Sequence, residues 1–219
     1  MNNSPKIYLI HAADVAMGPI VASFVANWPE ARTVNLLEDA LMTDLAADGR
    51  LTDAMIERFV HIGQYCVKAG ADGILFTCSA FGPAIEECRR QVSIPVLKPN
   101  EAMYEQLVAR SGTVGLLATF QPSLPSMLAE IDAYAKRQGT DVKVRPTLVE
   151  GALDALLARR ADEHNRLIAE AAVREKSCDT LAFAQFSMAP AKPLAAGRTS
   201  TPILTTPDSA VAKLKTLLA

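Results

Sequence analysis

Short apolar runs alternate with longer amphipathic segments along the whole chain. The runs are almost continuously apolar, which is typical of parallel strands that helices cover on both faces. Such runs occur at residues 6–10, 32–36, 73–77, 95–97, 113–118, 142–144, 180–184 and 202–204. The pattern therefore predicts an α/β fold.

The segments between the runs carry the spacing of amphipathic helices. One helix is expected to begin after Thr52, a residue type that caps helix N-termini, and to end at Gly70. Its expected apolar face consists of Met55, Phe59, Ile62 and Val67. Residues 162–175 show the same pattern, so helices are expected to alternate with the strands.

The order of elements in the first half recurs in the second half at an offset of 107 residues. "ADGILFTCSAFGPA" lies over "CDTLAFAQFSMAPA", so that Asp72 matches Asp179, and "IPVLKPNEA" lies over "TPILTTPDS". We interpret this as a duplicated βα unit. It predicts two subdomains related by a pseudo-twofold axis, each a parallel four-stranded sheet flanked by helices.

The repeat also predicts the domain boundaries. Residues 1–98 with 205–219 are expected to form the first α/β subdomain and residues 99–204 the second, with the active-site cleft between them. The segment 205–219 is expected to pack as a helix on the first subdomain.

Polar side chains follow the predicted strands at the positions where open parallel sheets bind ligands. In the first half these are His11, Asn35, Cys78, Ser79, Lys98 and Asn100. In the second half they are Thr119, Gln185, Ser187, Thr205 and Thr206. Cys78 and Gln185 match each other in the repeat, and the whole set converges on one cleft if the two halves face each other.

Cys78 is expected to be the reactive residue, since "FTCSAFG" places it at a strand-to-helix turn. A helix N-terminus and nearby backbone N–H groups are expected to lower the pKa of the thiol and favour the thiolate. The alternative is a small buried apolar residue, as most free cysteines are. The other cysteines, Cys66, Cys88 and Cys178, are expected to be structural.

The histidines and hydroxyls leave two interpretations open. His11 is either a hydrogen-bonded structural residue or a catalytic one, and His61 and His164 are expected at the surface of helices. Thr119 and Ser123 in "LLATFQPSLPS" either cap a helix or donate hydrogen bonds to a carboxylate.

Composition narrows the class of partner. Lys and Arg total 22 against 24 Asp and Glu, a net charge of −2, which gives no reason to expect nucleic acid or an anionic membrane. There is no apolar run of about 20 residues and no signal-peptide pattern, so a cytoplasmic protein with reduced thiols is expected. No metal-ligand spacing and no nucleotide-binding glycine pattern occurs. The sequence is compatible with a homo-oligomer.

Three motifs together carry a resemblance to a known family. "DGILFTCSAFGPAIE", "VGLLATFQPS" and "LAFAQFSMAP", in this order, resemble the aspartate/glutamate/hydantoin racemase superfamily. The resemblance implies a cofactor-independent enzyme with two α/β subdomains around a cleft. Racemases of this superfamily use two cysteines, one from each half, on opposite faces of the substrate α-carbon. Relatives with one cysteine include arylmalonate decarboxylase, and maleate isomerase uses a cysteine as nucleophile.

Carried over by motif, the first cysteine is Cys78, but the second falls on Gln185. Because an amide cannot titrate, the usual thiol pair is missing, and the resemblance implies one-sided chemistry. Cys78 would then act as acid, base or nucleophile, and Gln185 would hydrogen bond at the second face. A substrate carboxylate would be held by His11, Ser79, Thr119, Ser123 and Ser187, and the family's Asn or Asp near the first strand end is His11 here.

The resulting hypothesis is an enzyme that makes or breaks a bond at the carbon α to the carboxylate of a small acid. Racemase, isomerase and decarboxylase chemistry all fit it. The alternative is a non-catalytic protein that binds a small carboxylate and retains the racemase fold.

Overall fold

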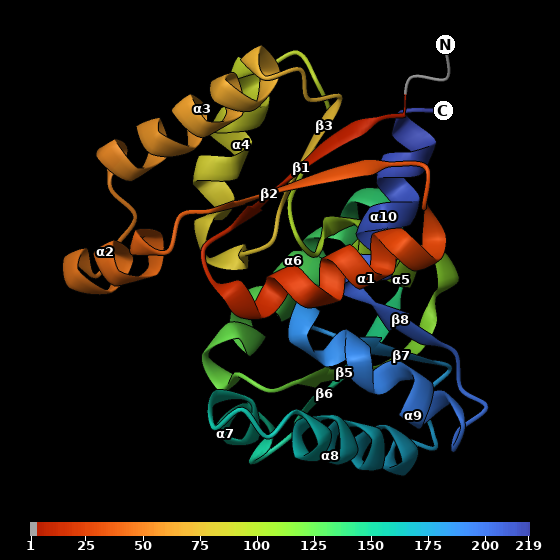
Figure 1. The fold of residues 1–219 in the computed structure, drawn as a ribbon. Coiled ribbons are helices and arrows are strands. Elements are labelled where there is room, and N and C mark those ends of the chain that lie inside the picture. Colours follow the sequence, from red (N-terminus) through yellow and green to blue (C-terminus); the bar gives the residue numbers. More distant parts are fainter. Residues whose placement is uncertain (1–3) are drawn as a thin grey trace. The chain divides into compact units, whose positions relative to one another are not determined.

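The computed structural model describes residues 4–219 and divides the chain into two compact units (Figure 1). Unit 1 comprises Met1–Ala102 and Ala210–Ala219, and unit 2 comprises Met103–Ser209. The chain passes between the units within α5 (Glu101–Arg110) and within α10 (Thr206–Leu217).

Unit 1 is built on a sheet of four parallel strands in the order β2-β1-β3-β4. Its strands are β1 (Lys6–His11), β2 (Arg32–Leu37), β3 (Gly73–Phe76) and β4 (Val96–Leu97). Its helices are α1 (Met17–Asn27), α2 (Ala40–Asp48), α3 (Asp53–Lys68) and α4 (Gly82–Gln91). The C-terminal half of α10 also packs here, since a Cβ on Gly73 would lie 3.4 Å from Leu214 Cδ2.

Unit 2 repeats this plan, with four parallel strands in the order β6-β5-β7-β8. Its strands are β5 (Gly112–Ala118), β6 (Val142–Leu148), β7 (Thr180–Phe183) and β8 (Ile203–Thr205). Its helices are α6 (Leu124–Gln138), α7 (Ala152–Leu157), α8 (Ala161–Arg174) and α9 (Lys192–Ala196). The prediction of an α/β fold with two parallel four-stranded sheets flanked by helices is confirmed.

Burial follows each strand's place in its sheet. The inner strands β3 and β7 are buried along their whole length, which explains their continuous apolar sequences. The edge strands β2 and β6 are partly exposed, and β6 contains Pro146. An edge strand tolerates proline because its missing N–H can face away from the sheet.

The internal repeat extends to individual hydrogen bonds. The Asp72 carboxylate accepts the backbone N–H of Lys6 at 2.7 Å, which ties the start of β1 to the start of β3. At the matching positions of unit 2, the Asp179 carboxylate accepts the N–H of Thr113 at 2.8 Å. Two aspartates that are conspicuous in the sequence repeat therefore have the same structural role.

Helix α3 begins and ends where the sequence predicts. The Thr52 hydroxyl accepts the Met55 N–H at 3.3 Å, and Gly70 has a φ of +78°, which a residue with a Cβ rarely adopts. The buried face differs from the expected one, because Ile62 and Val67 are only partly buried. The residues at its centre are Met55, Phe59, Gly63 and Cys66. Among the residues that the structure describes, no helix has both the length and the apolar character needed to cross a membrane.

Gly63 lets α3 approach α4 closely. A Cβ at this position would overlap with Cys88 Sγ and would lie 3.3 Å from Val92 Cγ1. We therefore predict that Gly63→Ala lowers the free energy of unfolding by about 1–3 kcal/mol, the usual cost of overpacking, although alanine has the higher helix propensity. Urea unfolding of the purified protein measures the change.

The matched background is Cys88→Ala, which removes the sulfur that the new methyl group would meet. In that background Gly63→Ala should cost less than about 0.5 kcal/mol, because the cavity accepts the methyl group. Equal costs in both backgrounds would show that the two helices are not held apart by this contact.

Candidate functional site

Cys78 and Gln185 occupy the same position in the two units. Cys78 lies between β3 and a short 3₁₀ helix, η2 (Ser79–Phe81), and Gln185 lies between β7 and η4 (Phe186–Ala191). Both backbones are extended, with φ, ψ of −120°, 122° at Cys78 and −117°, 150° at Gln185. Each unit thus presents one of these side chains just beyond the carboxyl end of an inner strand, where parallel sheets bind ligands.

A hydrogen bond beyond each strand end holds the turn. The Thr77 N–H donates to Ile10 O at 3.0 Å, and the matching Ala184 N–H donates to Leu117 O at 3.0 Å. In unit 1 the Thr77 hydroxyl also contacts Ile10 O at 3.2 Å. The inner strands are therefore coupled up to the residue that precedes Cys78 or Gln185.

The Cys78 thiol is partly buried, and its Sγ lies 3.8 Å from Met42 Sδ of α2. Burial raises the pKa of the thiol, while a backbone hydrogen bond from Ala80 lowers it by less. The expectation of a lowered pKa is therefore wrong for this structure, because the loss of water outweighs one backbone donor. Near neutral pH the thiol rests protonated, as a proton donor that becomes a nucleophile only after losing its proton.

We predict that iodoacetamide labels Cys78 faster as the pH rises from 6 to 8, by up to about tenfold per pH unit, because only the thiolate reacts. The other cysteines should label more slowly, because Cys66 and Cys88 are fully buried with pKa values of about 12 and about 11. Mass spectrometry of tryptic peptides gives the rate at each site. A rate for Cys78 that does not change over this pH range would mean that the thiolate is already formed at pH 6.

His11 is fully buried at the end of β1 with hydrogen bonds at both ring nitrogens. Its Nδ1 lies 2.9 Å from Thr77 Oγ1, and its Nε2 lies 2.9 Å from Asn35 Oδ1. Burial lowers the pKa of the imidazole more than the Asn35 contact raises it, so the ring is neutral near pH 7. The ring therefore links β1 to Asn35 of β2 and to Thr77, the residue that follows β3 and precedes Cys78. Of the two roles that the sequence left open for His11, these contacts support the structural one.

Two candidate residues of unit 2, Thr119 and Ser123, hydrogen bond to Gln185. Its Oε1 accepts the backbone N–H of Thr119 at 3.0 Å, and its Nε2 donates to Ser123 Oγ at 3.3 Å. The Ser123 hydroxyl donates in turn to Phe120 O at 2.7 Å. The amide nitrogen carries two N–H donors, so a ligand can still receive one of them. Gln185 thus links the end of β7 to the loop that follows β5.

The two candidate serines lie in the 3₁₀ helices next to these positions. Ser79 is exposed at the start of η2. Ser187 is partly buried in η4, and its carbonyl oxygen lies 3.1 Å from His164 Nε2. The turns carrying Ser79 and Ser187 follow Cys78 and Gln185 directly, so each unit offers a hydroxyl beside its candidate residue.

His164 is buried, so the expectation that it lies at the surface is wrong. It stands on the same face of α8 as Ile168 and Ala172, which are also buried. Besides its contact with Ser187 O, its Nδ1 lies 2.7 Å from Ala152 O at the start of α7. The ring therefore connects α7 to the 3₁₀ helix that follows Gln185.

We predict that His164→Leu lowers the free energy of unfolding by roughly 1–3 kcal/mol, because a buried carbonyl oxygen loses the donor that the ring supplies. Urea denaturation measures the loss. His61, which is exposed on α3, provides the control, and His61→Leu should change stability by less than about 0.5 kcal/mol. Losses of similar size at both positions would contradict the bridging role of His164.

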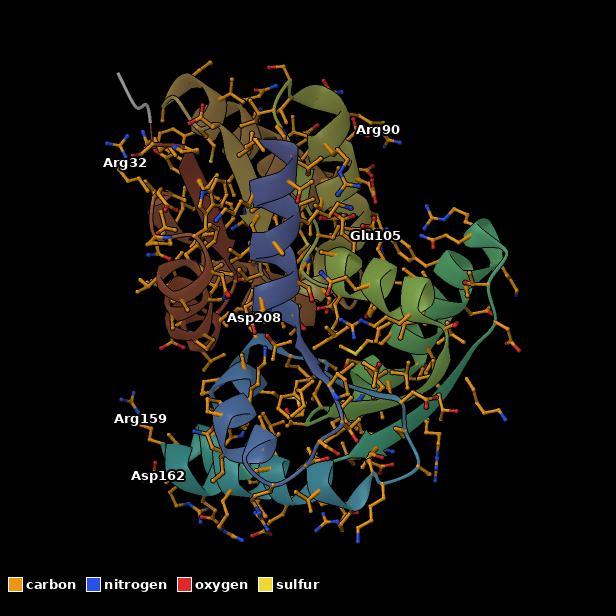
Figure 2. All side chains as sticks on the ribbon, turned by 90° about the vertical axis from the view of Figure 1, so that its right-hand side faces the viewer. Arg32, Arg90, Glu105, Arg159, Asp162 and Asp208 are labelled. Atoms are coloured by element: carbon orange, nitrogen blue, oxygen red, sulfur yellow. The ribbon has the colours of Figure 1, made fainter. Side chains whose placement is uncertain are left out.

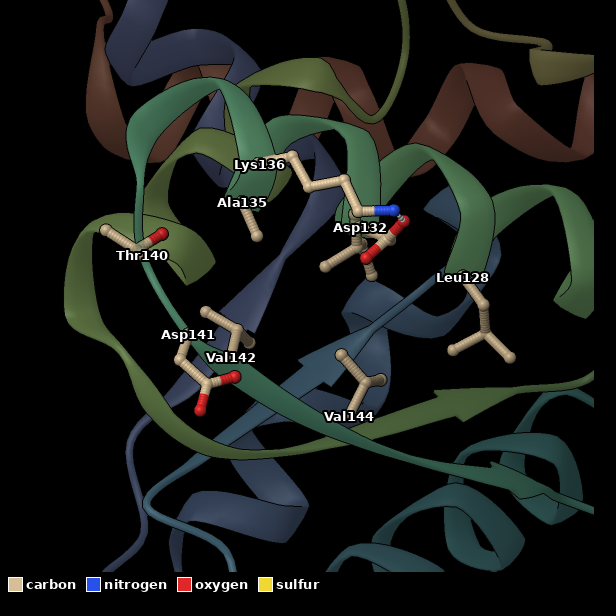
Figure 3. A pocket seen from close by; sticks show the side chains of 9 residues that line it. Leu128, Asp132, Ala135, Lys136, Thr140, Asp141, Val142 and Val144 are labelled. Atoms are coloured by element: carbon tan, nitrogen blue, oxygen red, sulfur yellow. Dashed lines mark ion pairs between the residues drawn. The ribbon is translucent and has the colours of Figure 1, made fainter.

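A cavity of about 380 Å³ lies apart from these residues, between α6 and β6 (Figure 3). It is lined by Leu128 and Asp132 of α6 and by Val142 and Val144 of β6, among others. Asp132 pairs there with Lys136 at 2.6 Å. None of the candidate site residues lines it. The cavity is at the amino half of an edge strand, whereas Gln185 follows the carboxyl end of an inner strand of the same sheet.

The groups at the strand ends suit a small acid. Within residues 4–219, no group of three or more His, Cys, Asp or Glu side chains is placed to hold a metal ion. The strand ends instead offer a thiol, an amide, hydroxyls and backbone N–H groups. Such donors can bind a carboxylate, and a thiol can exchange a proton with carbon.

Residues 28–214 match the family model described as Asp/Glu/Hydantoin racemase. This match spans most of the chain and includes Cys78 and Gln185, and the chain belongs to this family. No curated protein matches the sequence.

Solved structures of racemases share the fold. Picrophilus torridus aspartate racemase is 12% identical with a TM-score of 0.71, over 97% of this chain and 93% of that chain. Allantoin racemase from Klebsiella pneumoniae is 16% identical with a TM-score of 0.69, over 98% and 88%. Glutamate racemase from Francisella tularensis, in complex with D-glutamate, is 16% identical with a TM-score of 0.63, over 98% and 81%. At these identities the likeness shows the fold alone.

Proposed function

We propose that the chain is a racemase-type enzyme that acts, without a cofactor, at the carbon α to the carboxylate of a small acid. The observation that carries this proposal is the position of Cys78, a partly buried thiol at the carboxyl end of an inner strand in a member of this family. Racemisation, isomerisation and decarboxylation share an intermediate with negative charge on the α-carbon and the carboxylate. A single thiol can donate or remove the proton at that carbon, and racemisation also needs a second acid or base on the opposite face.

The protonated resting state of Cys78 favours a role as proton donor. In a decarboxylation the bond between the α-carbon and a carboxyl group breaks, CO₂ leaves, and the electron pair stays on carbon. The thiol proton then moves to that carbon and leaves a thiolate. In a racemisation or isomerisation the thiol must first lose its proton and then remove one from the substrate.

Backbone and hydroxyl donors at the strand ends would stabilise the charge that develops. The exposed Ser79 hydroxyl and the backbone of η2 lie next to Cys78 in the chain. In unit 2 the Gln185 amide retains a second N–H for a substrate oxygen, with Thr119, Ser123 and Ser187 in the same two turns. Donors that are already held in place stabilise a developing enolate without reorganising.

Gln185 would orient the substrate and exchange no proton, because an amide does not titrate near neutral pH. Its Oε1 is already engaged by Thr119. The chemistry that we propose is therefore one-sided and depends on Cys78 alone.

We predict that Cys78→Ala lowers turnover by about 10² or more, the usual loss for a general acid or base. Gln185→Ala should lower it less, mainly through a higher KM, since it removes an orienting hydrogen bond. Proton magnetic resonance in D₂O, with a panel of small carboxylic acids as substrates, follows deuterium incorporation at the α-carbon. Cys178→Ala is the control, because Cys178 is a buried thiol of unit 2 outside the strand ends.

The stereochemistry of the label tests the one-sided scheme. Deuterium in a single configuration supports it, whereas early label in both configurations would reveal a second base. Gln185→Cys, which supplies the second thiol, should then add racemisation. Binding of acids without exchange or decarboxylation of any of them would instead favour a non-catalytic carboxylate-binding protein.

A further inference from the structure

A buried hydroxyl without a partner lies at the cavity between α6 and β6. Thr140 Oγ1 is shielded from solvent and, among the side-chain nitrogen and oxygen atoms of residues 4–219, is the only buried one without a hydrogen bond. Thr140 lines the cavity, and Figure 3 shows its oxygen on the side of the Ala135 side chain. A buried polar group that is left unpaired costs free energy, so this hydroxyl indicates a place for a hydrogen-bonding ligand.

The end of α6 fixes Thr140 in this position. Gly139 ends the helix with a φ of +64°, and the Thr140 N–H donates to Ala135 O at 3.1 Å. A glycine in the left-handed region commonly closes a helix in this way. The Thr140 side chain therefore cannot leave the cavity without breaking the end of the helix.

Apolar side chains form the walls of the cavity. Leu128, Ile131 and Ala135 lie on one face of α6, since helix positions three and four apart are neighbours. Val142 and Val144 lie on one face of β6, since side chains alternate along a strand. The volume of about 380 Å³ falls in the range of small-molecule pockets. These walls suit the apolar body of a small organic molecule and not a hydrated ion.

The charged residues that line the cavity leave it with an excess of negative charge. Asp132 pairs with Lys136 at 2.6 Å, so these two charges compensate each other. Asp141 is exposed just before β6 and takes part in none of the ion pairs found within residues 4–219. Two carboxylates against one ammonium leave one negative charge, which attracts a cation and repels an anion.

We propose that this cavity is a second binding site, which takes a small primary amine with an apolar body. The body would pack on the valines of β6 and on the apolar face of α6. The ammonium group has three N–H donors, and it would pair with the Asp141 carboxylate and donate to the neighbouring Thr140 hydroxyl. The inference does not depend on the proposed function, because none of the candidate site residues lines this cavity.

The first experiment titrates the protein with phenethylamine, phenethyl alcohol and hydrocinnamate, which share a phenylethyl body and differ in charge. Amide chemical shifts, measured by nuclear magnetic resonance, report the site and the Kd. Phenethylamine should shift residues 128–144 saturably and bind about threefold more tightly than the alcohol, because an ion pair at an exposed rim contributes little. It should bind about tenfold more tightly than hydrocinnamate, which Asp141 repels. Ethylamine, which lacks the ring, should bind at least about tenfold more weakly than phenethylamine.

Three results of this titration would overturn the inference. Equal or tighter binding of the alcohol or the acid would refute the preference for an amine. Shifts that are largest at residues 77–81 or 184–191 would place the amine at the strand ends instead. No saturable shift of residues 128–144 by any probe up to about 10 mM would show that the cavity holds water only.

The second experiment uses Asp141→Asn, which removes the uncompensated charge. Binding of phenethylamine should weaken about threefold, to the level of phenethyl alcohol, whereas binding of the alcohol should not change. Asp162→Asn is the matched control, because Asp162 is an exposed residue in the first turn of α8 and does not line the cavity (Figure 2). Equal losses in the two variants would mean that only the net charge of the protein attracts the amine.

The third experiment uses Thr140→Val, which keeps the shape of the side chain and removes its hydroxyl. Binding of phenethylamine should weaken about threefold, because the ammonium loses an acceptor. The Tm of the free protein should not fall, because the hydroxyl has no hydrogen bond to lose. A lower Tm with unchanged amine binding would mean that the hydroxyl serves the fold and would overturn its role in the site.

Discussion

The coupling of the inner strands beyond their own ends is the interaction on which the rest of the site depends. In each unit the residue after the inner strand donates its N–H to the neighbouring central strand, from Thr77 to Ile10 and from Ala184 to Leu117. The backbone of the next residue, Cys78 or Gln185, is therefore fixed beyond the end of the strand without any side-chain contact. A backbone hydrogen bond of this kind depends little on side-chain identity, so a duplicated fold can keep the position and change the residue.

The side chains that support the two turns differ. In unit 1 the His11 ring joins Thr77 to Asn35, and in unit 2 both His11 and Thr77 are matched by alanines. The corresponding link is made there by Gln185 itself, which accepts the Thr119 N–H. The residue that matches Cys78 in the repeat thus performs in unit 2 the bridging that His11 performs in unit 1.

The sequence predicts the inner strands well because they are buried on both faces, and apolar runs of this kind report burial directly. The position of Cys78 followed from the same pattern together with the rule for strand ends. The direction of the pKa shift of Cys78 could not be predicted, because the sequence shows the helix N-terminus but not the packing of Met42 against the sulfur.

His164 was misplaced because one polar residue on an apolar helix face looks exposed. Its spacing to Ile168 and Ala172 was the signal that could have placed it inside. Thr77, which no motif singles out, gains its role only through the fold.

The bridging by Gln185 bears on why chemistry at this site would be one-sided. A thiol at position 185 could titrate, but sulfur is a weak acceptor and could not replace the amide oxygen that holds the Thr119 N–H. Gln185→Cys would therefore gain a titrating group and lose this hydrogen bond to the loop after β5. The two turns thus combine their groups differently, with a thiol beside a separate bridging histidine in unit 1 and a single amide that bridges and does not titrate in unit 2.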